Sequence, residues 1–450
     1  ALVMHLAGTG PLTWRLWDWS LSAVAGISIW KICQPYGNFP ALFASSLFLL
    51  IHGRDGIIEL GQRDLLLTVL ILISYALLFT LLRRPNVLLG RGYLAFLGSA
   101  SLTCAALVKP FALLLFPALA LCIFLTRTNV RHLLRRFYPH LKLGVVLPLL
   151  ATYVFLRRWH ADHAFVDVMA HLAPLHAAIL RKPLHVLLAH SISSVLRPLF
   201  FVWLLLCVMR RSWSNPDLAL LLTGVAVGIF SFCLQGRGYP YHRYPSEALL
   251  LVVIGIDLSS ALEGDKASRW LSYAGLAFAV ACLAPGSVRA MRHYDWRSNV
   301  LDDAIQAEMT NIGTSHFNRN VQCLDMAGGC ITALWRAHIL QSSGYLYDCY
   351  LFIPVQSESA RREQEWYREG FLQAFRQHTP QYLIVTSDEC GIVNSDFSYR
   401  KLTYWPELDT LIRSNYQLTR QWTPDVKEGW QGKPALPYGF RLYTQTTPAH

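Results

Sequence analysis

The sequence predicts a multi-pass α-helical membrane bundle followed by a small extracytoplasmic α/β domain. The first observation behind this prediction is composition, because 53% of the 450 residues are hydrophobic and only 15% are charged, against roughly 25% charged residues in soluble domains. The second is the distribution of charge. Residues 1–284 carry 24 Lys and Arg against 11 Asp and Glu, a net charge of +13, whereas residues 285–450 carry 16 against 17, a net charge of −1. We therefore expect a membrane domain over residues 1–284 and a soluble α/β domain over residues 285–450.

Apolar runs typical of membrane helices recur throughout residues 1–284. A spanning helix needs about 20 apolar residues, and several of these runs are shorter, so we expect their flanks to extend them. On this basis the membrane domain is predicted to hold about ten helices. The candidate spans are Trp14–Ile32, Phe39–Ile51, Leu65–Leu82, Tyr93–Val108, Phe111–Leu125, Leu143–Leu156, Leu184–Met209, Leu218–Leu234, Ala248–Leu262 and Leu271–Leu283.

Lysine and arginine in the loops predict the orientation of these spans. With Ala1 outside, the inner loops hold thirteen Lys and Arg and the outer loops nine, and the densest basic stretch, residues 127–142, lies inside. Residues 285–450 then lie outside. No basic stripe interleaved with aromatic residues occurs on a soluble segment, so we expect a lipid bilayer as partner and no nucleic acid.

Four cysteines fall in the expected soluble domain: Cys323, Cys330, Cys349 and Cys390. An even number of cysteines in an extracytoplasmic domain favours two disulfides, for which three pairings are open. Four unrelated free thiols are an equal alternative on the sequence alone. The chain contains no CxxC motif, so we do not expect a zinc or thiol redox site.

The expected soluble domain shows the pattern of alternating strands and helices. Residues 321–326 and 381–388 have the composition of buried strands, and residues 438–445 alternate like a final strand. Between the first two strands, residues 359–378 have helical spacing with Trp366, Phe371 and Phe375 among charges. Strand, helix and strand in this order predict a small parallel or mixed sheet. The domain contains neither GxGxxG nor a P-loop motif, so no nucleotide cofactor is expected.

Four polar stretches are predicted on the outer face of the membrane domain: residues 53–64, Lys109 with Pro110, the His-rich residues 157–185, and residues 235–247, which read QGRGYPYHRYPSE. A basic side chain at mid-bilayer costs about 2.5–3.5 kcal/mol on insertion scales, so such residues are usually paired or functional. Anchoring at the membrane interface is the alternative for each of them singly. The charged residues nearest to Lys109 in sequence, Arg91 and Arg127, are predicted on the opposite face, so its ammonium needs another anion, for which a phosphate would serve.

The His-rich stretch also raises the question of a metal. Only His160 and His163 are closely spaced, and no HExxH motif is present. Histidines scattered along an amphipathic interfacial loop are the favoured interpretation. A divalent metal held with Asp162 or Asp167 is the minor alternative, and we expect neither a metal site nor any other cofactor.

Four stretches resemble motifs of the GT-C superfamily, in particular the bacterial protein O-mannosyltransferases and the aminoarabinose transferases of the cell envelope. They are GTGPLTWRLWDWSLSAV (residues 8–24), ELGQRDLLLTVLILISYALL (residues 59–78), YLAFLGSASLTCAALVKPFALLLFPAL (residues 93–119) and QGRGYPYHRYPSEALL (residues 235–250). The second stretch departs from the family pattern, with Asp64 where Glu is usual and Leu65 where His is usual. The resemblance covers most of residues 1–284, and it rests on the order of the motifs rather than on any one of them.

The resemblance implies a glycosyltransferase that takes its sugar from a polyprenyl-phosphate donor on the outer face of a bacterial inner membrane. The acceptor is a lipid, a glycan or a protein. A carboxylate acts as general base, and cationic side chains stabilise the leaving phosphate. Residues 235–247 would then form a lid over the donor headgroup. The candidate residues are Glu59 and Asp64 for catalysis, Arg63, Lys109, Arg237, His242 and Arg243 for the donor phosphate, and Tyr239, Tyr241 and Tyr244 for contact with sugar or lipid.

One departure from the superfamily concerns the general base. The resemblance implies a catalytic acid in the first outer loop, after the first helix, and this sequence begins just past that point. We therefore expect an N-terminal segment that carries this residue, without which the chain as given would be inactive. Otherwise the residue is one of Glu59, Asp64, Asp162 and Asp167. A transporter or flippase of an anionic lipid is the alternative function, and a membrane-anchored binding protein is a third.

Overall fold

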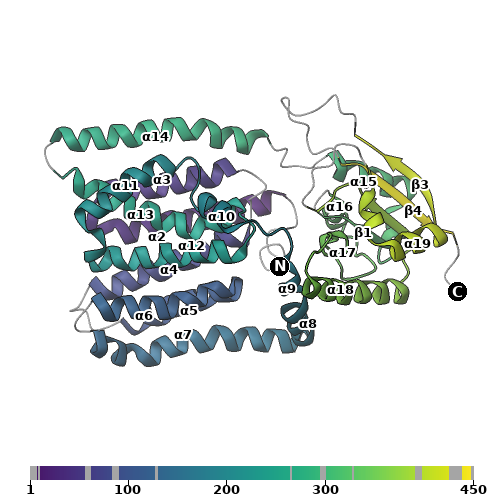
Figure 1. The fold of residues 1–450 in the computed structure, drawn as a ribbon, viewed down its shortest axis with the longest axis horizontal. Coiled ribbons are helices and arrows are strands. Elements are labelled where there is room, and N and C mark those ends of the chain that lie inside the picture. Colours follow the sequence, from purple (N-terminus) through teal and green to yellow (C-terminus); the bar gives the residue numbers. More distant parts are fainter. Residues whose placement is uncertain are drawn as a thin grey trace. The chain divides into compact units, whose positions relative to one another are not determined.

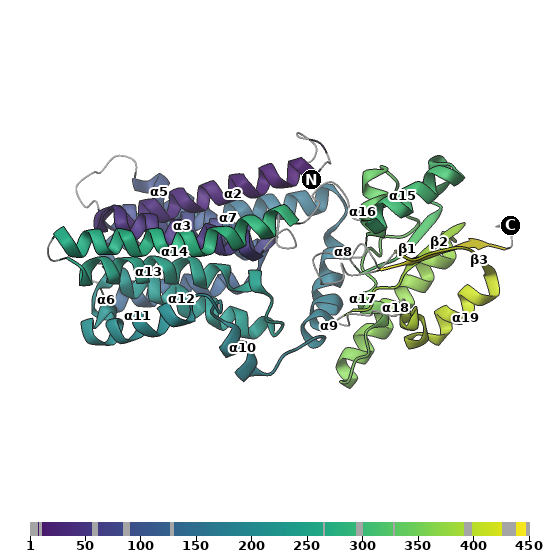
Figure 2. The same cartoon turned by 90° about the horizontal axis from the view of Figure 1, so that it is seen from above.

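The computed structural model divides into two compact units. The helical unit comprises residues 12–162 and 182–294, and the sheet unit comprises residues 1–11, 163–181 and 295–450. Each unit is described separately (Figures 1 and 2). The structure describes residues 8, 11–55, 62–83, 91–126, 130–263, 266–293, 300–326, 329–390, 398–424 and 438–446.

The helical unit is a bundle. Among its described residues, six helical segments are long and apolar enough to cross a membrane: Arg63–Arg83, Arg91–Val108, Arg135–Arg158, Pro216–Gln235, Pro240–Ala261 and Ser272–Ala290. In chain order its main helices are α2 (Pro11–Cys33), α3 (Asn38–Asp55), α4 (Arg63–Arg83), α5 (Arg91–Val108), α6 (Leu115–Thr126), α7 (Val130–Arg158), α10 (Leu184–His190), α11 (Arg197–Arg210), α12 (Pro216–Gln235), α13 (Tyr244–Ala261) and α14 (Lys266–His293). The protein therefore has the build expected of an integral membrane protein.

Helix α13 is the centre of this bundle. Every residue from Tyr244 to Asp257 is buried, and a helix that is apolar and buried on all sides belongs to the core rather than to a surface. It packs against α3, α4, α11 and α12. Figure 1 shows α7 and α14 at opposite edges of the bundle, where large apolar side chains such as Leu150 and Phe278 are exposed, as lipid-facing residues would be.

One expected span and one expected loop differ in the structure. The single span expected over Leu184–Met209 is divided into α10 and α11, because the polar residues between His190 and Arg197 interrupt the helix. The basic stretch over residues 127–142, expected in a loop, lies largely within α7, which begins at Val130. Leu, Arg and Lys all favour helix, so a basic cluster of this composition extends a helix readily.

The sheet unit contains a four-stranded mixed sheet in the order β1-β2-β4-β3. The parallel pair is β1 (Val321–Leu324) and β2 (Tyr382–Thr386), and β4 (Phe440–Gln445) is antiparallel to both β2 and β3 (Tyr416–Trp422). The three strands expected over residues 321–326, 381–388 and 438–445 are confirmed, as is the helix over residues 359–378, which is α18 (Glu358–Gln377). Strand β3 was not predicted, because its residues are mostly polar and exposed at the sheet edge.

Helices cover both faces of the sheet. One face, with Tyr382 and Ile384, packs against α15 (Val300–Ile312) and α16 (Cys330–Arg336). The other face, with Leu383 and Val385, packs against α17 (Cys349–Phe352), α18 and α19 (Pro406–Asn415). Successive side chains of a strand point to opposite faces, so one run of apolar residues supplies both cores. The expected fold class, a multi-pass helical bundle followed by a small α/β domain, is confirmed.

The four cysteines of the sheet unit form two disulfides. Cys323 is bonded to Cys330, and Cys349 is bonded to Cys390. The first bridge joins β1 to the start of α16, and the second joins α17 to the segment that follows β2. The structure thus selects one of the three pairings that the sequence left open.

Residues 163–181 pack within the sheet unit although they lie between two helices of the bundle in sequence. Leu175 and Ile179 are buried in one cluster with Cys349, Tyr350 and Ile353. Residues 173–178 form α9 (Ala173–Ala178), which contacts α18. The division between domains expected at residue 284 remains a prediction. Residues 163–181 lie on the membrane side of that expected boundary, although they belong to the sheet unit.

Two histidines of the His-rich stretch add polar contacts to this packing. His171 lies 2.7 Å from the Glu363 carboxylate, and its ring stacks on Trp366 with centroids 4.2 Å apart. His176 Nδ1 lies 2.5 Å from the hydroxyl of Tyr350. Contact with the α/β fold therefore accounts for two of these histidines without a metal.

A buried ion cluster lies at the end of the parallel strands β1 and β2. Lys401 is 1% exposed, and its Nζ donates to the Leu324 carbonyl at 2.9 Å, to Asp348 at 2.6 Å and to Asp388 at 3.1 Å. Burial raises the pKa of Asp348 to about 7, against the opposing effect of Lys401. Burial alone would lower the pKa of Lys401, but Asp348 and Asp388 outweigh it and raise that pKa above its ordinary value. The ammonium therefore stays charged and ties β1 to the segments that follow it.

Candidate functional site

The stretch QGRGYPYHRYPSE turns the chain back from α12 into α13. Gly236 and Gly238 have φ angles of 73° and 68°, a region that favours glycine, and Gly236 ends α12 as its cap. Pro240 then begins a short 3-10 helix, η6 (Pro240–Arg243), which leads directly into α13. η6 contacts α3, α4, α12 and α13, so this stretch lies where four helices of the bundle meet.

A buried ion pair lies beside this turn. Lys109 is 6% exposed and Asp64 is fully buried, and Lys109 Nζ donates to Asp64 Oδ1 at 2.6 Å and to Gln235 Oε1 at 2.5 Å. Lys109 follows α5 in extended backbone just before Pro110, which is the conformation that a following proline favours. The sequence predicted catalysis for Asp64 and phosphate binding for Lys109. These two residues are 45 positions apart and are in direct contact.

This pair supplies the anion that the sequence required for Lys109. Asp64 lies in the first turn of α4, where the helix dipole favours a negative charge. Its second oxygen, Oδ2, is buried and accepts no hydrogen bond from the residues that the structure describes. A buried carboxylate oxygen without a donor is uncommon, and it is the atom here that is best placed to accept a proton or a hydrogen bond from a ligand.

A second network links α2 and α3 to the start of α13. His52 Nε2 lies 2.9 Å from the Asp18 carboxylate, and His52 Nδ1 lies 3.2 Å from the hydroxyl of Tyr244. The Tyr244 hydroxyl also donates to Asp55 at 3.0 Å. Asp18, His52 and Tyr244 are all buried. This chain of polar groups therefore ties the start of α13 to α2 and α3.

Arg243 extends this network toward α13. Its guanidinium lies 3.8 Å from Asp55 and 3.2 Å from Glu247. Glu247 is 1% exposed and also accepts the backbone N–H of Ser193 at 2.5 Å. Arg243, predicted to contact the donor phosphate, is thus held between two carboxylates.

The remaining candidates have different environments. Arg237 and His242 are each 6% exposed. The rings of Tyr239 and Tyr241 stack with centroids 5.5 Å apart, and His242 presents its edge or face to both. Arg63 is exposed, Tyr244 is fully buried with its hydroxyl held as described, and Glu59 lies outside the described residues. The structure therefore groups five candidates, Asp64, Lys109, Arg237, His242 and Arg243, around one turn.

No family model matches the sequence, and no curated protein matches it. Solved structures do match. ArnT from Cupriavidus metallidurans bound to undecaprenyl phosphate aligns with a TM-score of 0.53 at 12% identity, over 98% of this chain and 86% of that one. The same protein in the apo state aligns with a TM-score of 0.51 at 14% identity, over 98% and 85%. The chain shares the fold of these ArnT structures.

The arabinofuranosyltransferase AftD from Mycobacteria shows the same likeness. It aligns with a TM-score of 0.55 at 14% identity, over 98% of this chain and 34% of that chain. This chain therefore spans about a third of that protein, and about 85% of ArnT. The resemblance inferred from the four motifs is confirmed for the fold.

Within this fold, sequence reasoning missed five residues of the site: Asp18, His52, Asp55, Gln235 and Glu247. Ionisable residues inside apolar spans are a recognised functional signal, and that rule would have singled out Asp18 and His52. Gln235 and Glu247 stand at the two ends of the quoted stretch. Their long-range partners, Lys109 for Gln235 and Ser193 for Glu247, were not readable, because each is distant in sequence.

The space beside the pair is small. A cavity of about 20 Å³ adjoins Gln235 and His242 and is otherwise lined largely by apolar residues of α4, η3 (Pro110–Leu114), α6, α12 and α13. That volume suits one water molecule. Among the described residues, no group of three or more His, Cys, Asp or Glu could hold a metal ion.

Proposed function

We propose that this protein transfers a sugar from a polyprenyl-phosphate donor to an acceptor on the outer face of a bacterial inner membrane. The observation that carries the proposal is the buried Lys109–Asp64 pair at the turn QGRGYPYHRYPSE, inside a GT-C fold. A buried ammonium and two buried cationic or imidazole side chains, Arg237 and His242, suit a phosphate. The ArnT structure with this fold holds undecaprenyl phosphate.

Lys109 and Asp64 have separate roles in the proposed reaction. The acceptor hydroxyl oxygen forms a bond to the anomeric carbon, the bond from that carbon to the phosphate oxygen breaks, and the hydroxyl proton passes to a carboxylate. The transition state has oxocarbenium character and the phosphate leaves as an anion, so cationic donors at the phosphate lower the barrier. Lys109 would turn from Asp64 to the phosphate, which leaves Asp64 with both oxygens available as general base. Glu59 remains a second candidate for that base.

Donor binding requires the lid to move. A cavity of about 20 Å³ cannot hold a sugar phosphate, whereas ligand pockets usually measure roughly 300–1,000 Å³. The segment over Gln235 to Arg243 closes the site between α12 and α13. We assign it the role of a lid whose Arg237, His242 and Arg243 face the phosphate and whose Tyr239 and Tyr241 face sugar or lipid.

The sheet unit is proposed to lie outside the cytoplasm. Its two disulfides, Cys323–Cys330 and Cys349–Cys390, support this location, because disulfides persist in oxidising compartments and are rare in the cytosol. Alkaline phosphatase fused after His450 is expected to be active in a bacterial host, because it needs its own disulfides, and green fluorescent protein fused there is expected to stay dark. A fluorescent fusion with inactive phosphatase would place this end in the cytoplasm.

Transfer itself is tested with the complete gene product in nanodiscs. A panel of polyprenyl-phosphate donors with tritiated sugars is incubated with a membrane lipid and glycan extract as acceptor. We expect the label to move from donor to acceptor with release of one polyprenyl phosphate per sugar. Movement of intact labelled donor across a vesicle membrane without bond cleavage would instead identify a flippase, and would refute the transferase.

A further inference from the structure

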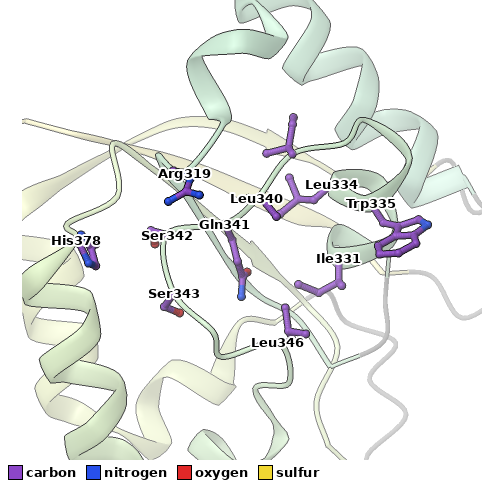
Figure 3. Close-up of a pocket in the computed structure, with 11 residues that line it drawn as sticks. Arg319, Ile331, Leu334, Trp335, Leu340, Gln341, Ser342, Ser343, Leu346 and His378 are labelled. Atoms are coloured by element: carbon purple, nitrogen blue, oxygen red, sulfur yellow. The ribbon is translucent and has the colours of Figure 1, made fainter. Parts of the chain in front are cut away.

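The sheet unit contains a cavity of about 480 Å³ beside the edge strand β1 (Figure 3). Its wall is built by the segment that follows α16, residues 339–346, together with α16 itself, Arg319 and His378. The volume falls within the range of roughly 300–1,000 Å³ that is usual for small-molecule sites. All of its lining residues belong to the sheet unit.

The lining separates into a polar half and an apolar half. Figure 3 shows Arg319, Ser342, Ser343 and His378 on one side and Ile331, Leu334 and Trp335 of α16 on the other, with Gln341 between them. That apolar side consists of Ile331, Leu334, Trp335, Ile339, Leu340 and Leu346. An occupant that satisfies both halves must itself be polar at one end and apolar at the other.

The polar half is positioned by the backbone. Arg319 has a φ of 62°, a left-handed conformation that is uncommon for a residue other than glycine, and its N–H donates to the Leu340 carbonyl at 2.6 Å. Ser342 and Ser343 both donate to Oε1 of the buried Gln322, at 3.2 and 2.6 Å. The two walls of the cavity are therefore tied to each other and to β1, and the Ser343 hydroxyl oxygen in turn accepts the backbone N–H of Tyr345 at 3.2 Å.

The charge of the cavity favours an anion. Arg319 carries a permanent positive charge, His378 can carry one, and the described residues that line the cavity include no carboxylate. Neither side chain makes a hydrogen bond or an ion pair within the part of the chain that the structure describes. A guanidinium in this setting recognises phosphate or carboxylate by paired, charge-assisted hydrogen bonds.

The apolar half favours a hydrocarbon chain over a saccharide. Leu340 and Leu346 are each 57% exposed and Trp335 is 46% exposed, so covering them removes apolar surface from water at about 25 cal/mol per Å². Contiguous exposed apolar surface commonly marks a binding site. A sugar is usually held by aromatic faces and many polar groups, whereas this wall is mainly branched aliphatic.

We propose that this cavity binds the headgroup end of an anionic lipid amphiphile. Its phosphate lies against Arg319 and His378, and its hydrocarbon chain runs along Leu334, Leu340 and Leu346. This site belongs to the sheet unit and is distinct from the Lys109–Asp64 site. The inference does not rest on the proposed transferase activity and would stand if that activity failed.

The test uses the complete protein in nanodiscs of neutral phosphatidylcholine. The probe is a dodecyl phosphate with a photoactivatable diazirine on its chain, and labelled residues are located by mass spectrometry. We expect labelling within residues 331–346, reduced about tenfold or more by Arg319→Gln, because a charge-assisted contact to phosphate is lost. Arg362→Gln, at an exposed arginine that does not line the cavity, is the matched control and should label normally.

Two further measurements decide between the alternatives. Leu340→Asp places a carboxylate at an exposed position of the wall and should abolish labelling even if Arg319→Gln proves unstable. Labelling that is equally strong with an uncharged dodecanol probe, or that Arg319→Gln leaves unchanged, would overturn the proposal. Efficient competition by glucuronate but not by unlabelled dodecyl phosphate would overturn it in favour of a saccharide site.

Discussion

Replacing Lys109 with methionine is expected to abolish sugar transfer and also to destabilise the helical unit. Removal of one partner from a buried ion pair leaves an uncompensated charge, which typically costs about 3–5 kcal/mol. Asp64 is fully buried and has Lys109 as its ion-pair partner. We therefore expect Asp64→Asn combined with Lys109→Met to unfold at nearly the wild-type temperature, because no charge is left unpaired, yet to remain inactive.

This pair of variants separates chemistry from folding. Thermal unfolding of the nanodisc-embedded protein gives the stability, and release of polyprenyl phosphate gives the activity. His242→Ala, which removes a proposed phosphate contact, is expected to reduce the rate by about 10²–10³. The matched control is the ion pair between Arg83 and Asp217, at 2.8 Å in the same unit. Its neutral double variant, Arg83→Met with Asp217→Asn, should keep activity, and full activity in the Asp64/Lys109 double variant would refute the proposed site.

Replacing Lys401 with methionine is expected to destabilise the sheet unit by about 3–5 kcal/mol near pH 8, and by much less at pH 5. Burial already raises the pKa of Asp348 to about 7, and loss of the ammonium raises it further. A carboxyl whose folded pKa exceeds its unfolded pKa binds more protons when folded, so its contribution to stability falls as pH rises between the two values. The variant should therefore regain stability on acidification.

The measurement is the midpoint of thermal unfolding at pH 5, 6, 7 and 8, for wild type and variant. Arg413→Met is the control, because Arg413 is 75% exposed and forms a surface ion pair with Asp409, where such pairs contribute about 0–1 kcal/mol. It should shift the midpoint little and equally at every pH. If Lys401→Met lowers the unfolding midpoint by the same amount at pH 5 and pH 8, protonation of Asp348 does not determine the stability of this cluster.

The elements with a strong periodic pattern were predictable from the sequence. Apolar runs gave α4, α5, α12 and α13 nearly to their ends, and alternation gave β4, since both signals are local. Strand β3 was missed because its exposed residues are polar and its assignment depends on pairing with β4. The break between α10 and α11 was missed because a hydropathy run does not register a short polar interruption.

The sequence singled out several residues of the site, but it did not show which of them are in contact. The quoted stretch and Lys109 stood out because polar residues are costly between apolar helices. That Asp64 lies 2.6 Å from Lys109 depends on how α4 packs against α5, and no local pattern encodes that packing. For the same reason the cysteine count indicated two disulfides, whereas their pairing required the fold.

The packing of Leu175 and Ile179 against Cys349 and Tyr350 bears on how proteins of this architecture can be recombined. A segment inserted between two bundle helices completes the apolar core of an α/β fold encoded more than a hundred residues later. Residues 295–450 therefore cannot be exchanged between such proteins as an independent domain. A chimera that exchanges residues 295–450 alone would bring a new partner surface to an old segment, so residues 163–181 have to be exchanged with it.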